Sequence, residues 1–242
     1  MLTSWDERRD LALPGDEKTT IAFAAGHWVR LAKAAIAHSG RFAVALSGGS
    51  TPKAIFEHLA KQPNILDWSR VWLFWSDERS VGPDHPDSNY HMAMEAGLSK
   101  LPLLPQNIFR MKAEDHIEKH ASEYEEIVRS TLGKSLFDLV MLGLGEDGHT
   151  ASLFPHTKAL KETKRLVAAN HVPEKNTWRM TFTFPCINQS QCSVIYALGK
   201  GKASIVKEVL KATLPSAWPA SHVGTKERKA LWILDDSASQ LL

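Results

Sequence analysis

Apolar residues along the chain form two kinds of pattern: short continuous runs, and longer stretches in which they recur at helical spacing. The short runs indicate buried strands at residues 42–46, 71–75, 137–142, 166–169, 179–184, 193–198 and 230–234. The longer stretches predict helices over residues 17–38, through Ile55, Phe56 and Leu59, and over residues 89–98, 115–132 and 203–211. Because strands alternate with helices, the sequence predicts a mainly parallel, doubly wound α/β sheet with helices on both faces, a Rossmann-like arrangement. No repeat or linker-like break interrupts the pattern, so we expect residues 1–242 to form a single domain.

Composition places the chain among ordinary globular proteins. Of its 242 residues, 43% are hydrophobic and 23% are charged, and the formal net charge of +2 is too small to predict binding to nucleic acid or to an anionic membrane. The N-terminal segment is polar and charged, and no apolar run reaches transmembrane length, so we expect neither a secretory signal nor a membrane span. The expectation is a cytoplasmic protein that is a monomer or a weak homo-oligomer.

The two cysteines, Cys186 and Cys192, are separated by five residues. A disulfide across one hairpin is an alternative, but free thiols in a reducing compartment are the better interpretation. No CxxC pair is present, and no His or Cys cluster has the spacing of metal ligands. The sequence therefore predicts no metal and no cofactor.

Three of the predicted strands end in loops of small or ionisable residues, which read SGGSTP, SDERS and GLGEDGHT. In a doubly wound sheet, ligands bind beyond the carboxyl ends of the strands. If these strands are neighbours, the three loops converge on one pocket.

The first loop presents the backbone N–H groups of Gly48, Gly49, Ser50 and Thr51 with little side-chain bulk, and it leads into a helix. Such a turn can bind a phosphate through its amides and the helix dipole. It is not a Walker A loop, because no Gly-Lys-Ser/Thr ends it. It is not a nucleophile elbow either, because no glycine stands two residues before its first serine. An ordinary tight turn is the alternative.

The second loop places Asp77, Glu78 and Arg79 at a strand end. A carboxylate there can bind a sugar hydroxyl, and Arg79 can pair with an acid or a phosphate. A solvated charged turn is the alternative.

The third loop carries both a possible cofactor motif and a possible catalytic pair. Residues 143–148 spell G-x-G-x-x-G, which matches a dinucleotide-binding fingerprint. That interpretation needs a full helix after the third glycine and an acid about 20 residues further on. Pro155 follows only seven residues after Gly148, and the next predicted strand ends without an acid. Asp147 and His149 instead offer a base and the group that orients it.

Two further cations, Arg179 and Lys202, lie at or beside later strand ends. Lys202 belongs to the segment GKGKA, in which a glycine turn opens a helix, so a cation and free amides coincide. That combination suits a phosphate monoester, whereas surface charge is the alternative for either residue alone.

Taken together, these segments resemble the 6-phosphogluconolactonase family, in the superfamily that also contains glucosamine-6-phosphate deaminases and isomerases. The matching blocks, in the family's order, are ALSGGSTP, WSDERSVGPDHPDSNY, FDLVMLGLGEDGHTASLFP, GKGKA and WPASHV. The deaminase branch continues past the histidine with IAFNEP, whereas this chain reads TASLFP and lacks the acid that helps to open the sugar ring. One departure from the family is His222 in WPASHV, where arginine is frequent, so a phosphate role there stays open.

The resemblance implies a glucosamine-6-phosphate deaminase-like fold and the hydrolysis of 6-phospho-D-glucono-1,5-lactone, a phosphosugar lactone, without a metal or cofactor. It implies that His149 is the general base that activates water and that Asp147 fixes its tautomer. Arg79 would pair with Asp147 or with the substrate. The implied substrate contacts are Gly48, Gly49, Ser50, Thr51, Asp77, Arg179 and Lys202, the last two with the phosphate. A deaminase or isomerase of the same fold and a non-catalytic sugar-phosphate sensor are the alternatives.

Overall fold

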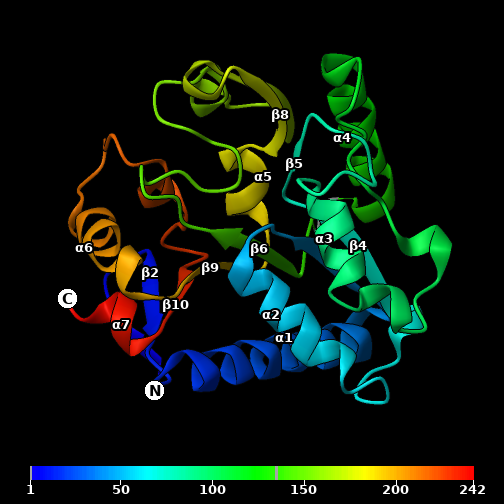
Figure 1. Ribbon diagram of the computed structural model, residues 1–242, viewed down its shortest axis with the longest axis horizontal. Coiled ribbons are helices and arrows are strands. Elements are labelled where there is room, and N and C mark those ends of the chain that lie inside the picture. The colour runs from blue at the N-terminus through cyan, green and yellow to red at the C-terminus, as the bar shows by residue number, and fades with distance from the viewer. Residues whose placement is uncertain (1, 134–135) are drawn as a thin grey trace.

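A computed structural model, which describes residues 2–133 and 136–242, has a seven-stranded sheet at its centre (Figure 1). The strand order is β1-β2-β10-β9-β6-β3-β4, and every neighbouring pair is parallel except β1 with β2. Its strands are β1 (Leu2–Ser4), β2 (Arg9–Ala12), β3 (Phe42–Leu46), β4 (Val71–Trp75), β6 (Leu139–Gly143), β9 (Ser193–Ala197) and β10 (Ala230–Leu234). All residues of β3, β9 and β10 are buried, as the continuous apolar runs predicted.

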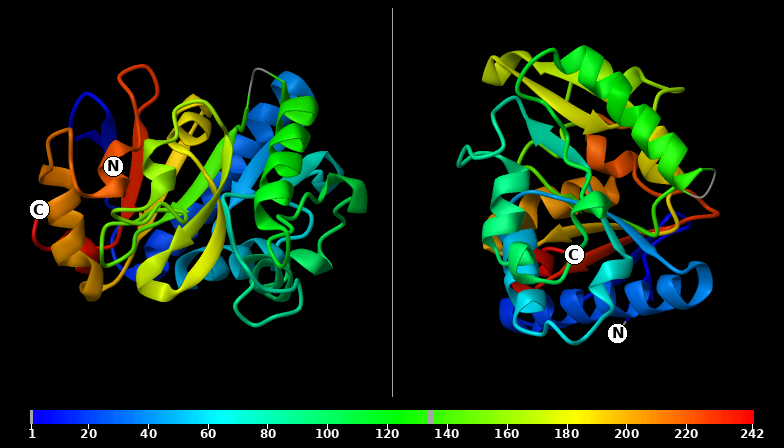
Figure 2. Two further views of the ribbon diagram at one scale, coloured as in Figure 1. Left: turned by 90° about the horizontal axis from the view of Figure 1, so that it is seen from above. Right: turned by 90° about the vertical axis from the view of Figure 1, so that its right-hand side faces the viewer.

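Helices cover both faces of this sheet, which confirms the doubly wound arrangement. Figure 2 shows α1 on one face and α4 on the other. The helices are α1 (Glu17–Ser39), α2 (Ser50–Ala60), α3 (Asn89–Glu95), α4 (Ile117–Leu132), α5 (Phe184–Gln189), α6 (Ala203–Lys211) and α7 (Asp236–Ser239). None of the described helices combines the length and the apolarity that crossing a bilayer requires.

Helix ends follow local signals in the sequence. The carboxylate of Asp16 accepts a hydrogen bond from the N–H of Thr19 at the start of α1, and Gly40 ends that helix with φ = 77°. The helix expected over residues 89–98 is shorter, because Gly97 adopts φ = 111° just after α3. A short 3₁₀ turn continues the chain from there.

Two of the predicted strands lie outside the central sheet. β7 (Val167–Val172) and β8 (Thr177–Phe182) form an antiparallel hairpin, and β5 (Asp77–Arg79) pairs with β8 on its other side. A parallel pairing of β7 and β8 would need a crossover of about a dozen residues, whereas only four residues separate them. The small sheet β5-β8-β7 lies beside α4, above the carboxyl ends of the central strands (Figure 1).

The N-terminal strands β1 and β2 were not predicted, because charged residues hide their pattern. Arg9 is buried in β2, where its guanidinium forms an ion pair with Asp6 and donates to the carbonyl groups of Val209 and Leu210. A buried arginine is tolerated only when its donors are satisfied in this way. Hydropathy alone therefore could not mark this segment as a strand.

Candidate active site

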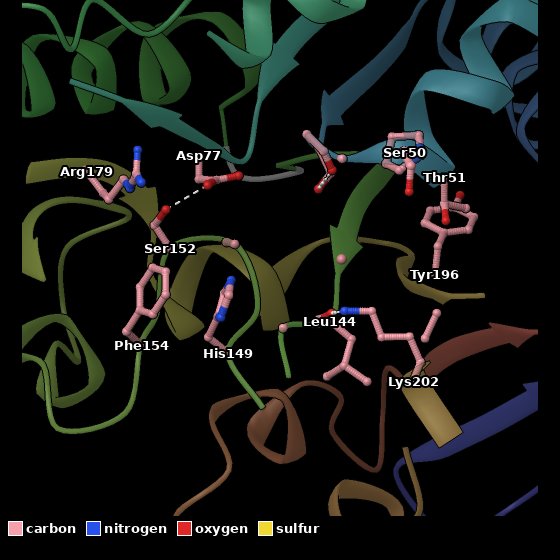
Figure 3. A pocket seen from close by; sticks show the side chains of 18 of the residues that line it. Ser50, Thr51, Asp77, Leu144, His149, Ser152, Phe154, Arg179, Tyr196 and Lys202 are labelled. Carbon is pink, nitrogen blue, oxygen red and sulfur yellow. Dashed lines mark hydrogen bonds between the residues drawn. The ribbon is translucent and has the colours of Figure 1, made fainter. Parts of the chain in front are cut away.

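The three loops singled out in the sequence line one pocket, as expected (Figure 3). They come together because β3 lies between β6 and β4 in the sheet, so the loops that follow these three strands are adjacent at one edge. The small sheet adds residues of β5 and β8 to the same pocket. The pocket encloses about 330 Å³, within the range of sites that bind small metabolites.

His149 and Asp147 form a hydrogen-bonded pair at this pocket. Nδ1 of His149 lies 2.5 Å from Oδ1 of Asp147, and the backbone N–H of His149 donates to the same oxygen at 3.2 Å. Burial raises the pKa of Asp147, but hydrogen bonds and charge from His149 outweigh burial and leave the pKa below its usual value of 3.8. Asp147 is therefore ionised at neutral pH. The His149 side chain is 26% exposed, so its ring is open to the pocket on one side.

The glycine turn and an aromatic ring hold this imidazole in place. A Cβ atom on Gly145 would lie 2.0 Å from Nδ1 of His149, and the N–H of Gly145 donates to the His149 carbonyl at 2.9 Å. The ring of Phe154 stacks on the imidazole with centroids 4.0 Å apart and an interplanar angle of 24°. The second glycine of the G-x-G-x-x-G pattern thus makes room for the histidine, not for a pyrophosphate.

The WPASHV segment supports the same turn from behind. Gly148 has φ = 73°, a Cβ atom on it would lie 2.7 Å from the Trp218 ring, and its carbonyl accepts from the N–H of Ala220 at 2.9 Å. Nε2 of His222 lies 3.0 Å from the carbonyl oxygen of Ser216, and the ring stacks on Phe184. His222 is not among the residues that line the pocket. This segment therefore buttresses the turn through Trp218 and Ala220.

The two acids of the second loop have different surroundings. Asp77 lines the pocket and accepts a hydrogen bond from the hydroxyl of Ser152 at 2.7 Å. Glu78 is turned toward the start of α3, where its carboxylate accepts from the backbone N–H groups of Asn89 and Tyr90 and from the Ser88 hydroxyl. It also accepts from the backbone N–H of the next residue along the chain. Burial raises the pKa of Glu78 above 4.5 despite these hydrogen bonds. Glu78 anchors the loop, and Asp77 is the acid available to a ligand.

Arg79 and Arg179 stand directly opposite each other in the antiparallel pair β5–β8. Burial lowers the pKa of Arg179, and the positive charge of Arg79 lowers it further. An anion between the two guanidinium groups would relieve their repulsion. Arg79 donates to the Asp87 carbonyl at 2.7 Å, and it makes no ion pair with Asp147 among the described residues. Its expected pairing with Asp147 or with the substrate stays a prediction.

The first loop and Lys202 form the other end of the pocket. Gly49 precedes α2 with φ = 105°, and no side chain in the described parts of the chain caps the free N–H groups of this helix. The ammonium group of Lys202 donates to the carbonyl of Leu144 at 2.7 Å. Figure 3 shows Arg179 beside Asp77 and Lys202 beside Leu144, with His149 between the two cations.

Sequence reasoning missed several residues around the pocket. Ser152 and Phe154 follow His149 in the same block, so their closeness in sequence was a usable signal.

Other pocket residues come from segments distant in sequence. Lys175 lies in the turn between β7 and β8, with its Nζ atom 5.6 Å from the centroid of the Phe154 ring. Tyr196 lines the pocket from β9. It stands in a continuous apolar run, so the sequence alone does not distinguish it from a core residue. Asn89 lies behind the first loop, and a Cβ atom on Gly48 would overlap its side-chain amide.

Both cysteines are free thiols, as expected. Within residues 2–133 and 136–242, no three His, Cys, Asp or Glu side chains are grouped as a metal ion would need.

Comparison with known proteins agrees with the motif resemblance. Residues 15–232 match the family model described as glucosamine-6-phosphate isomerases/6-phosphogluconolactonase. A protein of Chlamydia pneumoniae named 6-phosphogluconolactonase is 37% identical over 236 residues, which cover 96% of this chain and 90% of that protein. The structure of 6-phosphogluconolactonase from Thermotoga maritima aligns with a TM-score of 0.82 at 29% identity, covering 94% of this chain and 100% of that one. A monomeric glucosamine-6-phosphate deaminase shares the fold, with a TM-score of 0.83 at 18% identity, covering 96% of this chain and 99% of that one.

Proposed function

The chain belongs to the glucosamine-6-phosphate isomerase/6-phosphogluconolactonase family, and from this premise we propose that it opens a sugar-phosphate lactone with His149 as general base. It is an enzyme that hydrolyses 6-phospho-D-glucono-1,5-lactone to 6-phospho-D-gluconate, a step of the oxidative branch of the pentose phosphate pathway. The observation that carries the role of His149 is its 2.5 Å contact with an ionised Asp147 at the pocket.

The chemistry follows from the tautomer that this contact selects. Because Nδ1 of His149 faces a carboxylate, the ring proton resides on Nδ1, and Nε2 is the free basic nitrogen. Nε2 takes a proton from water as the water oxygen attacks the lactone carbonyl carbon. The resulting imidazolium, stabilised by Asp147, then gives the proton to the ring oxygen as its bond to that carbon breaks.

The two cationic ends of the pocket suit the two ends of this substrate. We assign the phosphate to the free N–H groups at the start of α2, at Ser50 and Thr51, together with Lys202, because a helix N-terminus and a cation both favour a phosphate. The Arg79–Arg179 pair then faces the lactone carbonyl, where negative charge develops during attack and a carboxylate forms. Asp77 accepts hydrogen bonds from the sugar hydroxyls between these ends. In this assignment only Lys202 of the two expected phosphate cations keeps that role.

A deaminase activity is less well supported by the same site. The position that carries an acid in the deaminase branch is Phe154 here, and its ring packs on the base. A non-catalytic sugar-phosphate sensor would have no need for an ionised acid beside an imidazole. Both observations favour lactone hydrolysis.

An assay of purified protein tests the proposal. The protein should open freshly generated 6-phosphogluconolactone far faster than the spontaneous reaction and release no ammonia from glucosamine 6-phosphate. His149→Asn should lose nearly all of this activity with an unchanged circular dichroism spectrum, since general bases supply about 10²–10⁴-fold. A variant that keeps more than about a tenth of the wild-type rate would rule out the base assignment.

Two further properties belong to the proposal. We expect a monomer or weak homo-oligomer, and sedimentation velocity measures this. The free cysteines support a reducing, cytoplasmic location, which fractionation of cells tests.

A further inference from the structure

Ser152 is held at the junction of three elements that surround the pocket. Its hydroxyl donates to Oδ2 of Asp77 at 2.7 Å. Its backbone N–H donates to the Thr181 hydroxyl of β8 at 3.1 Å, and its carbonyl accepts from the side-chain amide of Asn170 of β7 at 2.9 Å. These residues are all buried. The backbone of Ser152 is thus fixed without its hydroxyl, which serves Asp77 alone.

Asp77 depends on this hydroxyl for its orientation. The Asn89 amide donates to the Asp77 carbonyl at 2.9 Å and reaches Oδ1 only at 3.4 Å, so the Ser152 hydroxyl makes the short contact to the carboxylate. Asp77 is 6% exposed, and Figure 3 shows its carboxylate at the pocket, joined to Ser152. Oxygen lone pairs remain on the carboxylate for donors that come from the pocket.

We infer that Ser152 is a positioning residue, whose hydroxyl orients the Asp77 carboxylate so that it accepts hydrogen bonds from the sugar hydroxyls of the substrate. The inference rests on the proposed function, because it concerns recognition of that substrate. It also separates two tasks of one loop. The backbone of the loop carries His149 and Phe154, whereas the Ser152 hydroxyl serves only binding.

This separation predicts which kinetic constant changes in Ser152→Ala. The Thr181 and Asn170 bonds to the Ser152 backbone remain, so the imidazole keeps its place and kcat changes by less than about threefold. A disordered carboxylate binds the sugar less well in ground state and transition state alike, so KM rises about 5–20-fold. The pH at which kcat falls on acidification stays the same as in the wild type.

A double-mutant cycle tests whether Ser152 acts through Asp77. The affinity for 6-phosphogluconate is measured by calorimetry in the wild type, Ser152→Ala, Asp77→Ala and the double variant. Ser152→Ala should weaken binding about 5–20-fold in the wild type but less than about twofold in the Asp77→Ala background. Ser190→Ala is the matched control, because Ser190 is equally buried but its hydroxyl donates to the Cys186 carbonyl away from the pocket.

Equal losses of affinity in both backgrounds would overturn the inference, as would a fall in kcat with an unchanged KM. If Ser152→Ala unfolds early in a thermal melt, Ser152→Cys keeps the side-chain size with a weak donor, and the same comparison holds. A wild-type protein without lactonase activity would instead contradict the proposed function. The two failures are therefore distinguishable.

Discussion

The Cα atom of Gly145 lies directly against the imidazole of His149, so closely that an added Cβ atom would be 2.0 Å from Nδ1 and 2.6 Å from the Asp147 carboxylate. No rotamer adjustment of a side chain locked between an acid and the Phe154 ring can absorb such an overlap. Gly145 is therefore part of what places the proposed base, although it has no chemistry of its own.

Gly145→Ala should lower kcat by about 100-fold or more, because displacing a catalytic group by about 1 Å has an effect of that size. Steady-state kinetics measures this, and the far-ultraviolet circular dichroism spectrum should stay unchanged. A variant with wild-type kcat would show that the imidazole position is not critical.

Gly26→Ala is the matched control for that substitution. Gly26 is exposed in the middle of α1, and an added Cβ atom has nothing within 4 Å. The change should leave kcat unaltered and raise the free energy of unfolding by about 0.5–1 kcal/mol, because alanine loses less backbone entropy in a helix. Urea denaturation measures the gain, and a loss of stability would contradict this account of α1.

The pH dependence of kcat should reflect the imidazole and not its partner acid. The pKa of Asp147 lies below 3.8, so this carboxylate stays ionised well into the acidic range. A protonated imidazole cannot accept a proton from water, so kcat should fall on acidification while Asp147 is still ionised. A profile that stays flat into the acidic range would contradict a histidine base.

Lys202 and Arg179 should differ in their effects on phosphorylated and unphosphorylated substrates. Lys202→Met should raise KM for the phosphorylated lactone at least about tenfold and change little with glucono-1,5-lactone, since it removes a charged contact to the phosphate. Arg179→Met should impair both lactones, because both develop charge at the carbonyl. If Arg179→Met affected only the phosphorylated lactone, the assignment of the two pocket ends would be reversed.

His27 should make the fold sensitive to acid. It is 8% exposed, its Nδ1 atom has no partner among the described residues, and burial lowers its pKa to about 4. The native state therefore keeps the neutral form, whereas the unfolded chain takes up a proton below pH 6.5. Stability is lost as the pH falls from about 6.5 to about 4, by roughly 3 kcal/mol.

His27→Leu removes that proton uptake, so its free energy of unfolding should fall less between about pH 7 and about pH 4.5 than that of the wild type. Urea unfolding at both pH values gives the difference. Identical losses in the two proteins would contradict the assignment. His58 is a suitable control position, because it lies outside the buried core on α2.

The sequence was most informative where the local pattern was strong. The strands predicted at residues 42–46, 71–75 and 230–234 coincide with β3, β4 and β10, because continuous apolar runs bounded by turns leave little choice of structure. The convergence of the three loops also followed from sequence, because parallel strands end at one edge of a sheet. By contrast, the charged strand β2 was not predicted, because the buried guanidinium of Arg9 donates hydrogen bonds to carbonyl groups that are distant in sequence.

By itself, the sequence determined the α/β class, the loops that form the site and the pairing of Asp147 with His149, since all of these depend on neighbours along the chain. Only the tertiary structure decided that β5, β8 and β7 form a separate sheet, which brings Arg179 opposite Arg79. It also decided that Asp77, not Glu78, lines the pocket, and that Ser152 holds it. The physical reason is that a local pattern fixes which side of an element is buried, whereas the partner of a polar side chain depends on packing between segments far apart in sequence.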